Sequence, residues 1–167
     1  TAFASAGISG LSSIAVTSDA ETTVDETNVV TALTSGVVTT TISDNDLTTL
    51  AGITDTGNAL TISVTDASAD AAALNVLNGK TTTAITVTST TITGSLSDIN
   101  TAYAANSAGT ITGLGNETVT VSDTGTVSAS DLIVLNGLTT GVVTVSSATT
   151  VSGSQADITT IYSANSA

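Results

Sequence analysis

Short segments in which aliphatic and hydroxyl side chains alternate recur along the chain. This alternation predicts half-buried strands, because successive side chains of a strand point to opposite faces. We expect such strands in segments 14–17, 37–40, 62–65, 85–88, 119–122 and 143–146. Equivalent positions recur with a period of about 24, except that the step from Ile85 to Val119 is longer by about ten. The pattern therefore predicts stacked coils of this period, with an insertion near 108–117 in the fourth.

A longer sequence repeat spans two of these coils. Leu77-Asn78-Gly79 returns as Leu135-Asn136-Gly137 at an offset of 58, and the block 91–108 returns as 150–167 at an offset of 59. Self-similarity at a fixed period is typical of arrays in which each unit buries its apolar side against its neighbours. We expect an α/β solenoid (a β-solenoid with short helices) of about six coils in one domain, 14–167. Each coil has one or two short parallel strands and a capped helical turn, and segment 1–13 is an uncharged cap, strand or docking tail.

A serine followed three positions later by an aspartate opens the second half of several coils. A serine hydroxyl at the N-cap accepts a hydrogen bond from a free backbone N–H, and an acidic side chain is stabilised in the first helical turn. Glycine turns follow the apolar stretch behind these pairs and mark helix ends. We expect helix capping by Ser43 and Asp46, Ser95 and Asp98, Ser128 and Asp131, and Ser154 and Asp157.

Composition narrows the classes of partner. The chain has 167 residues and a net charge of −13, with Lys80 as its only cationic side chain, and it contains no Cys, His, Met, Pro or Trp. Nucleic-acid binding is excluded because it depends on several Lys or Arg contacts to phosphates. No run of 18 or more apolar residues is present, so we expect no membrane insertion. Since aromatic residues make up only 2%, the core has to be built from Val, Ile, Leu and Ala, with Tyr103 and Tyr162 as equivalent packing positions.

The segments 109–117, Gly-Thr-Ile-Thr-Gly-Leu-Gly-Asn-Glu, and 117–127, Glu-Thr-Val-Thr-Val-Ser-Asp-Thr-Gly-Thr-Val, carry a resemblance. They resemble the tandem repeats of giant secreted or cell-surface proteins of marine bacteria, cyanobacteria included. The resemblance covers 59–167 well and the first coils loosely. It implies an extracellular adhesive, filamentous or surface-coat role.

The chain offers little for catalysis. Without His or Cys it cannot build a Ser-His-Asp or Cys-His site. Paired-carboxylate hydrolysis remains formally open at Asp44 and Asp46 or at Asp66 and Asp70. Helix capping and solvated turns are the simpler interpretation of these acids, and a solvated loop is the simpler place for Lys80. We expect no enzyme activity.

Two binding hypotheses remain beside a structural role. Calcium takes oxygen ligands, and the acidic cluster Asp19, Glu21, Asp25 and Glu26 offers them, although solvated turn carboxylates are the simpler interpretation. A calcium-stabilised adhesin repeat is therefore one alternative. The other is an exposed hydroxyl face that binds ice, mineral or glycan. We expect this face to comprise Ser63, Thr65, Thr86, Thr88, Thr120, Ser122, Thr144 and Ser146.

The leading hypothesis is a structural extracellular protein that acts as a rigid shaft, surface coat or filament subunit. The last copy of the long repeat stops at Ala167, where the first copy continues into Gly109-Thr110-Ile111. An open last coil presents strand edges that another strand can pair with. We therefore expect either a slice of a longer repeat chain or head-to-tail self-association, which does not close and so grows into filaments.

Overall fold

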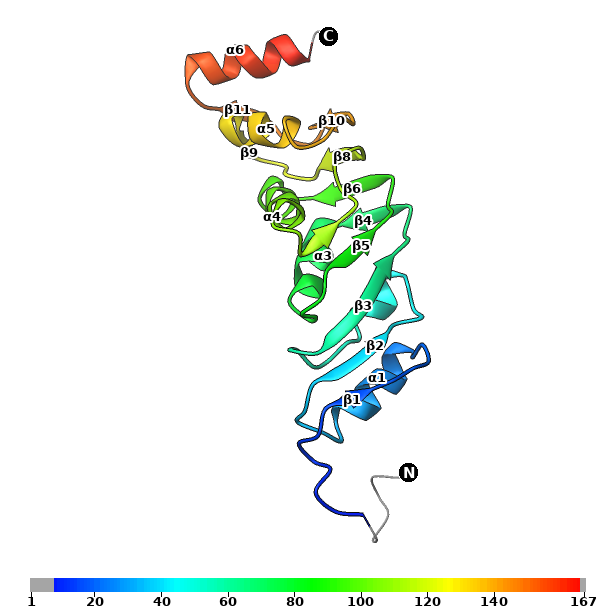
Figure 1. The fold of residues 1–167 in the computed structure, drawn as a ribbon. Helices are drawn as coiled ribbons and strands as arrows, with labels where there is room; N and C mark the ends of the chain where they lie inside the picture. The colour runs from blue at the N-terminus through cyan, green and yellow to red at the C-terminus, as the bar shows by residue number, and fades with distance from the viewer. Residues whose placement is uncertain (1–7, 166–167) are drawn as a thin grey trace.

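The computed structural model describes residues 8–165 and shows an elongated α/β molecule (Figure 1). All paired strands are parallel, the sheets do not close into a barrel, and six helices are present in these residues. The first sheet contains β1 (Val16–Thr17), β2 (Val38–Thr41), β3 (Ala59–Val64), β5 (Ile85–Val87) and β7 (Ile111–Thr112), in that order. The second sheet contains β4 (Ser68–Asp70), β6 (Thr91–Gly94), β8 (Thr118–Val121) and β10 (Val143–Thr144), and the third contains β9 (Thr126–Ser128) and β11 (Thr150–Ser152).

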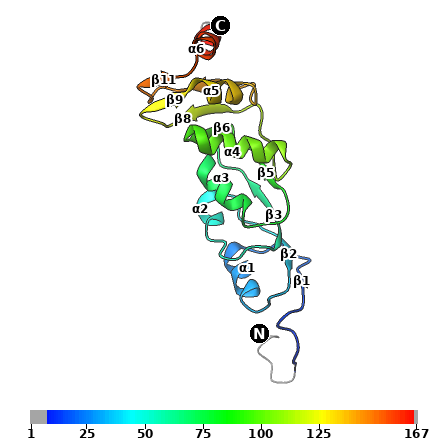
Figure 2. The same ribbon diagram turned by 90° about the vertical axis from the view of Figure 1, so that its left-hand side faces the viewer.

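The helices follow the strands in a regular order. They are α1 (Val24–Thr31), α2 (Leu47–Leu50), α3 (Ala71–Asn78), α4 (Leu96–Ser107), α5 (Ala129–Asn136) and α6 (Gln155–Ala164). From α2 to α6, each helix contacts the next one along the chain. Seen from the side, α1, α2 and α3 lie along one flank of the molecule, and β1, β2, β3 and β5 of the first sheet lie along the other (Figure 2).

Strand register agrees with the sequence at two steps and differs from it at others. Ile62 pairs with Ile85, and Val119 pairs with Val143, as the alternating pattern predicts. At the first step, Val38 is paired with Val16, two residues beyond Ile14. The expected equivalence of Ile85 with Val119 is wrong, because Ile85 pairs with Ile111.

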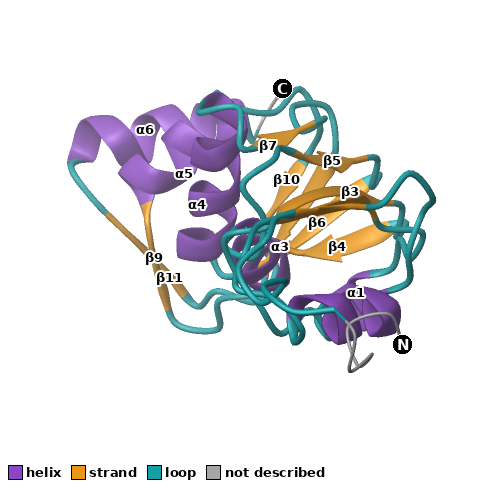
Figure 3. Cartoon of the chain, turned by 60° about the horizontal axis from the view of Figure 1, so that its bottom comes forward, coloured by secondary structure: helices purple, strands orange, loops and turns teal. Residues whose placement is uncertain are grey.

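The segment 108–117 explains that difference. It does not form a simple insertion: it contains β7, which extends the first sheet by one strand. The chain then enters the second sheet at β8 and the third at β9. After α5, the next strand β10 joins β8 in the second sheet, so the first sheet ends at β7. The view toward one end of the molecule shows the third sheet beside the helices, away from the other strands (Figure 3).

The core is aliphatic, as the composition requires. Inward-facing positions of the strands alternate with exposed hydroxyl positions, so that β3 is buried at Leu60, Ile62 and Val64 and exposed between them. Each helix from α1 to α5 adds one or a few buried residues, such as Leu74 in α3 and Ile99 in α4. The buried residues form one continuous cluster from α1 to α5, and α6 contributes no buried residue.

Candidate functional site

The helix N-termini show which capping residues the chain uses. Ser95, Ser128 and Ser154 are the N-caps of α4, α5 and α6, and each hydroxyl accepts a hydrogen bond from the N–H of the aspartate three positions later, Asp98, Asp131 and Asp157 respectively. The expected box at Ser43 does not form. Asp46 is itself the N-cap of α2 and accepts from the N–H of Thr49 at 2.9 Å.

Three aspartates that follow strands accept hydrogen bonds from the N-terminus of the helix in the preceding coil. The N–H of Val24, the first residue of α1, donates to Asp44 at 2.7 Å. In the same way the N–H of Leu47 in α2 donates to Asp66 at 2.8 Å, and that of Leu96 in α4 donates to Asp123 at 2.7 Å. These N–H groups have no partner inside their own helices, so each carboxylate satisfies a donor and lies at the positive helix end. We call these three residues the bridging aspartates.

The bridging aspartates also account for the proposed carboxylate pairs. In the pair Asp44 and Asp46, the first bridges to α1 and the second caps α2. In the pair Asp66 and Asp70, the first bridges to α2 and the second caps α3. Each of these four side chains therefore has a structural hydrogen-bond partner, which supports the capping interpretation over paired-carboxylate chemistry. The Nζ of Lys80 donates to the carbonyl oxygen of Thr54 at 3.4 Å.

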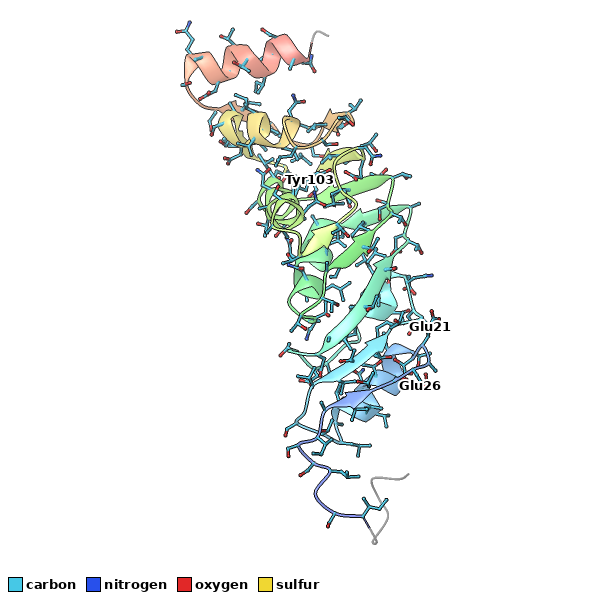
Figure 4. The ribbon with its side chains drawn as sticks, in the orientation of Figure 1. Glu21, Glu26 and Tyr103 are labelled. Atoms are coloured by element: carbon cyan, nitrogen blue, oxygen red, sulfur yellow. The ribbon has the colours of Figure 1, made fainter. Side chains whose placement is uncertain are left out.

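A buried acid lies where the chain passes from the first sheet to the second. Glu117 is 1% exposed, and its carboxylate accepts from the hydroxyl of Tyr103 at 2.7 Å and from the N–H of Gly115 at 2.9 Å. Tyr103 belongs to α4, and its side chain lies between that helix and the strands beyond it (Figure 4). Burial, together with the neighbouring Glu117 carboxylate, raises the pKa of Tyr103 above its ordinary value, so the phenol stays a hydrogen-bond donor.

Sequence reasoning missed the role of Glu117. Its position two residues before Val119 places it on the inward side of an alternating strand, where an acidic residue needs a partner. Tyr103, expected at a packing position, is 1% exposed. The inward-facing position of Glu117 in the alternating pattern was the signal from which its contact with Tyr103 could have been predicted.

The second copy of the long repeat has the same elements but a different environment. Tyr162 corresponds to Tyr103 at an offset of 59 and is 61% exposed, and α6 has no buried residue. Between α5, α6, β10 and β11 lies an open groove of about 600 Å³. Its lining includes Leu132, Val142, Val143, Val145, Val151 and Ile161. We call this the C-terminal groove.

A smaller hollow lies at the other end of the molecule. It has a volume of about 250 Å³ and lies between β1, β2 and α1, where Val16, Val30 and Val38 line it. β1 is an edge strand: it pairs with β2 on one side, and no described strand pairs with its other side. Among the described residues, both ends of the molecule therefore combine an apolar hollow with a strand edge that no other strand pairs with, at β1 and at β10 and β11.

The hydroxyl positions do not form one face. Ser63 and Thr86 are adjacent in the first sheet and continue into Thr112, whereas Thr120 and Thr144 are adjacent in the second sheet. Most of the eight expected residues are exposed, and Thr120 is half-buried. The expectation of a single column is wrong because the sheet changes at β7. Thr65, Thr88, Ser122 and Ser146 lie outside the strands.

The acidic residues near α1 do not gather into a metal site. Glu26 closes a capping box with Thr23: it accepts from the N–H of Thr23 at 2.9 Å, and its own N–H donates to the Thr23 hydroxyl at 3.2 Å. The hydrogen bond from the Thr23 backbone lowers the pKa of Glu26. Glu21 and Glu26 both lie beside α1 (Figure 4), and Asp19, Glu21 and Asp25 are exposed. Within 8–165, no group of three or more His, Cys, Asp or Glu side chains is arranged to hold a metal ion.

Comparison of the chain with protein-family models, with curated proteins and with solved structures finds no match. Among the residues that the structure describes, no helix combines the length and the apolar character needed to cross a membrane.

Proposed function

We propose that this chain is a structural repeat protein of the cell exterior: an acidic α/β solenoid of stacked coils that forms a shaft, coat or filament by self-association, without catalytic activity. The observation that carries the proposal is the open second copy of the repeat. The positions that are buried in α4 are exposed or half-buried in α6, beside an apolar groove with a strand edge that no described strand pairs with.

Coil-to-coil contacts support the solenoid. Parallel ladders connect strands of neighbouring coils, as in Ile62 to Ile85 and Ile92 to Val119. The bridging aspartates then fasten each of three helices to the coil that follows it. A molecule built in this way adds a coil by repeating one set of contacts, so its end coil is complementary to another coil of the same kind.

The distribution of charge supports association between ends. Asp and Glu number fourteen in the chain, and all but Asp157 lie between residues 19 and 131. Segment 1–18 has no charged side chain, and segment 132–167 carries only Asp157. Two copies with a net charge of −13 each repel one another along their sides. Their ends can approach at much lower electrostatic cost, which favours end-to-end over side-to-side contact.

The calcium and hydroxyl-face alternatives have less support. The acids near α1 are exposed or hold the α1 cap, and the hydroxyl residues are divided between two sheets. The extracellular setting rests on the resemblance of segments 109–117 and 117–127 to bacterial surface repeats.

Light scattering and electron microscopy at rising protein concentration test the proposal. We expect rods whose length increases with concentration and whose width stays that of a single chain. Salt of about 0.15 M should shorten the range of the repulsion between the acidic sides and so promote growth. A monomer whose mass is independent of concentration, in low and in moderate salt, would contradict the filament form of the proposal.

A further inference from the structure

Residues 111–123 cover the first copy of the repeat, and a similar sequence occurs near the N-terminus. In the first copy, β7 adds to β5 and β8 adds to β6, and Asp123 then bridges to α4. The sequence that does this begins Ile111-Thr112-Gly113-Leu114 and reaches Ser122-Asp123. Residues 8–19 begin Ile8-Ser9-Gly10-Leu11 and end Ser18-Asp19. An offset of 103 aligns Ile8 with Ile111 and Val16 of β1 with Val119 of β8, whereas Ser18-Asp19 aligns with Ser122-Asp123 at an offset of 104.

Backbone conformation matches at the glycine of this motif. Gly113 has a φ of 95° and Gly10 has a φ of 84°, both in the left-handed region that favours glycine. At Gly113 the reason is visible: a Cβ there would collide with the carbonyl oxygen of Val87 in the preceding coil. At Gly10 an added Cβ would meet no atom within 4 Å. Gly10 therefore has the conformation for a close approach to a preceding coil, and no described residue supplies that coil.

The acceptor and the donor of a further bridging hydrogen bond are present at opposite ends of the molecule. Asp19 lies two residues after β1 and four before the N-cap Thr23, the same spacing that Asp66 has to β3 and to the N-cap Asp70. Its side chain is exposed and accepts no hydrogen bond from residues 8–165. At the other end, the N–H of Gln155 begins α6 as that of Leu96 begins α4, and no described carboxylate bridges to it.

We infer that residues 8–19 of one chain cover the C-terminal groove of a second copy, in the register by which residues 111–123 cover the first copy of the repeat. Ile8 then lies beside Val143 of the other copy, as Ile111 lies beside Ile85. Val16 lies beside Val151, as Val119 lies beside Ile92, and Asp19 accepts from the N–H of Gln155. This inference rests on the proposed function and adds the partner segment, its register and the residue that bridges the joint.

The joint differs from the internal contact at several positions. Ile14 stands where Glu117 would be by the same offset, so the carboxylate that Tyr103 contacts has no counterpart in residues 8–19. Asp19 also comes one residue earlier than Asp123 when both are counted from the isoleucine. Because of this shorter spacing, the buried Val121 of the internal contact has no counterpart in residues 8–19. The joint therefore keeps the paired strand positions but lacks one buried hydrogen bond and one buried apolar side chain, which is consistent with a reversible end-to-end contact.

Engineered disulfides test the register directly, because the native chain contains no cysteine. Thr112 pairs with Thr86, so the inference places Ser9 beside Thr144 of the next copy, and both side chains are exposed. Neighbouring parallel strands lie about 4.8 Å apart, which is within the range that a disulfide spans. We expect the full-length Ser9→Cys/Thr144→Cys variant to give a ladder of covalent oligomers on oxidation, at least about ten times the yield of a Ser9→Cys/Ser152→Cys control.

A second measurement compares two acids at the same end. Asp19→Ala removes the bridging carboxylate, and we expect it to weaken association at least about tenfold, the loss of one hydrogen bond to a charged group. Glu21→Ala removes the same charge two residues away and should leave association unchanged. If the native chain assembles but the cysteine ladder matches its control, or Asp19→Ala assembles like Glu21→Ala, the register is wrong while the proposed function stands. Failure of the native chain to assemble contradicts the proposed function itself.

Discussion

The two copies of the long repeat form the same local structure in opposite environments. Residues 91–107 give β6 and a serine-capped α4, and residues 150–165 give β11 and a serine-capped α6. In α4 the residues Leu96, Ile99, Ala102 and Tyr103 are buried, whereas none is buried in α6. The cap and the alternation are properties of each copy, while burial depends on the coil that follows. Local structure in this chain is therefore specified within one coil and stability between coils.

The largest difference between the copies is expected at the two tyrosines. Tyr103→Ala removes a buried aromatic ring and leaves the Glu117 carboxylate with only the N–H of Gly115, so the free energy of unfolding should fall by about 3–5 kcal/mol. Tyr162→Ala removes an exposed ring and should cost less than about 1 kcal/mol in dilute solution. Urea unfolding followed by circular dichroism measures both. Equal losses would show that the two copies are equally packed in solution.

Substitution of the matched glycines sharpens the comparison. Gly113→Ala places a Cβ against the Val87 carbonyl at a left-handed φ, so both a collision and backbone strain should destabilise the fold. Gly10→Ala meets open space and should cost only the strain of the left-handed conformation, which is about 1–2 kcal/mol. The loss at Gly113 should therefore exceed that at Gly10. Thermal unfolding of the two variants at low concentration gives the measurement, and a greater loss at Gly10 would contradict it.

A missing bridge can be added at Ser89. Val64 and Val87 are paired, so Ser89 occupies the position of Asp66 one coil later, and its buried hydroxyl has no hydrogen-bond partner. In Ser89→Asp the carboxylate should accept from the N–H of Ala71 at the start of α3, with a gain of about 0.5–1 kcal/mol in unfolding free energy. Ser89→Asn is the control of similar size without charge. A loss of stability in the aspartate variant alone would show that the carboxylate does not reach the helix.

Acid should act at the N-termini of α1 and α2. Hydrogen bonds from backbone N–H groups lower the pKa of Glu26 at α1 and of Asp46 at α2, so their stabilisation is present above the unfolded values of 4.5 and 3.8 and is lost as pH falls through the lowered folded pKa values. The N-caps of α4 and α6 are serine hydroxyls, which do not titrate. Amide exchange from pH 5 to pH 3 should therefore show weaker protection in α1 and α2. Glu26→Gln keeps the capping box and should lose this response at α1.

The sequence pattern was sufficient where each coil specifies itself. Alternation over four residues predicted the paired positions Ile62 with Ile85 and Val119 with Val143. The Ser-x-x-Asp spacing points to the residues at which α4, α5 and α6 begin. In the Ser43 pair the pattern was misleading, because an aspartate caps a helix as well as a serine does and Asp46 lies nearer to the helix.

Contacts between coils were not predictable in the same way. β7 has only two residues, too few to show an alternation, so the sequence around Ile111 resembles an insertion. Asp66 and Asp123 stand at equivalent strand ends, but their bonds to Leu47 and Leu96 cross from one coil to another and leave no local spacing. The hydroxyl face was expected to be continuous because its interruption at β7 also depends on contacts between coils.

The passage of the chain from the first sheet to the third at β7–β9 has a geometric consequence. From the first copy of the long repeat to the second, one outer sheet of the molecule is replaced by another while the row of helices continues. If the proposed end-to-end joint repeats this step, successive copies turn about their long axis, and no sheet runs straight along the assembly. A filament of this protein would be a screw whose hydroxyl-bearing surfaces wind around it, so that it would meet a flat surface only at intervals set by its pitch.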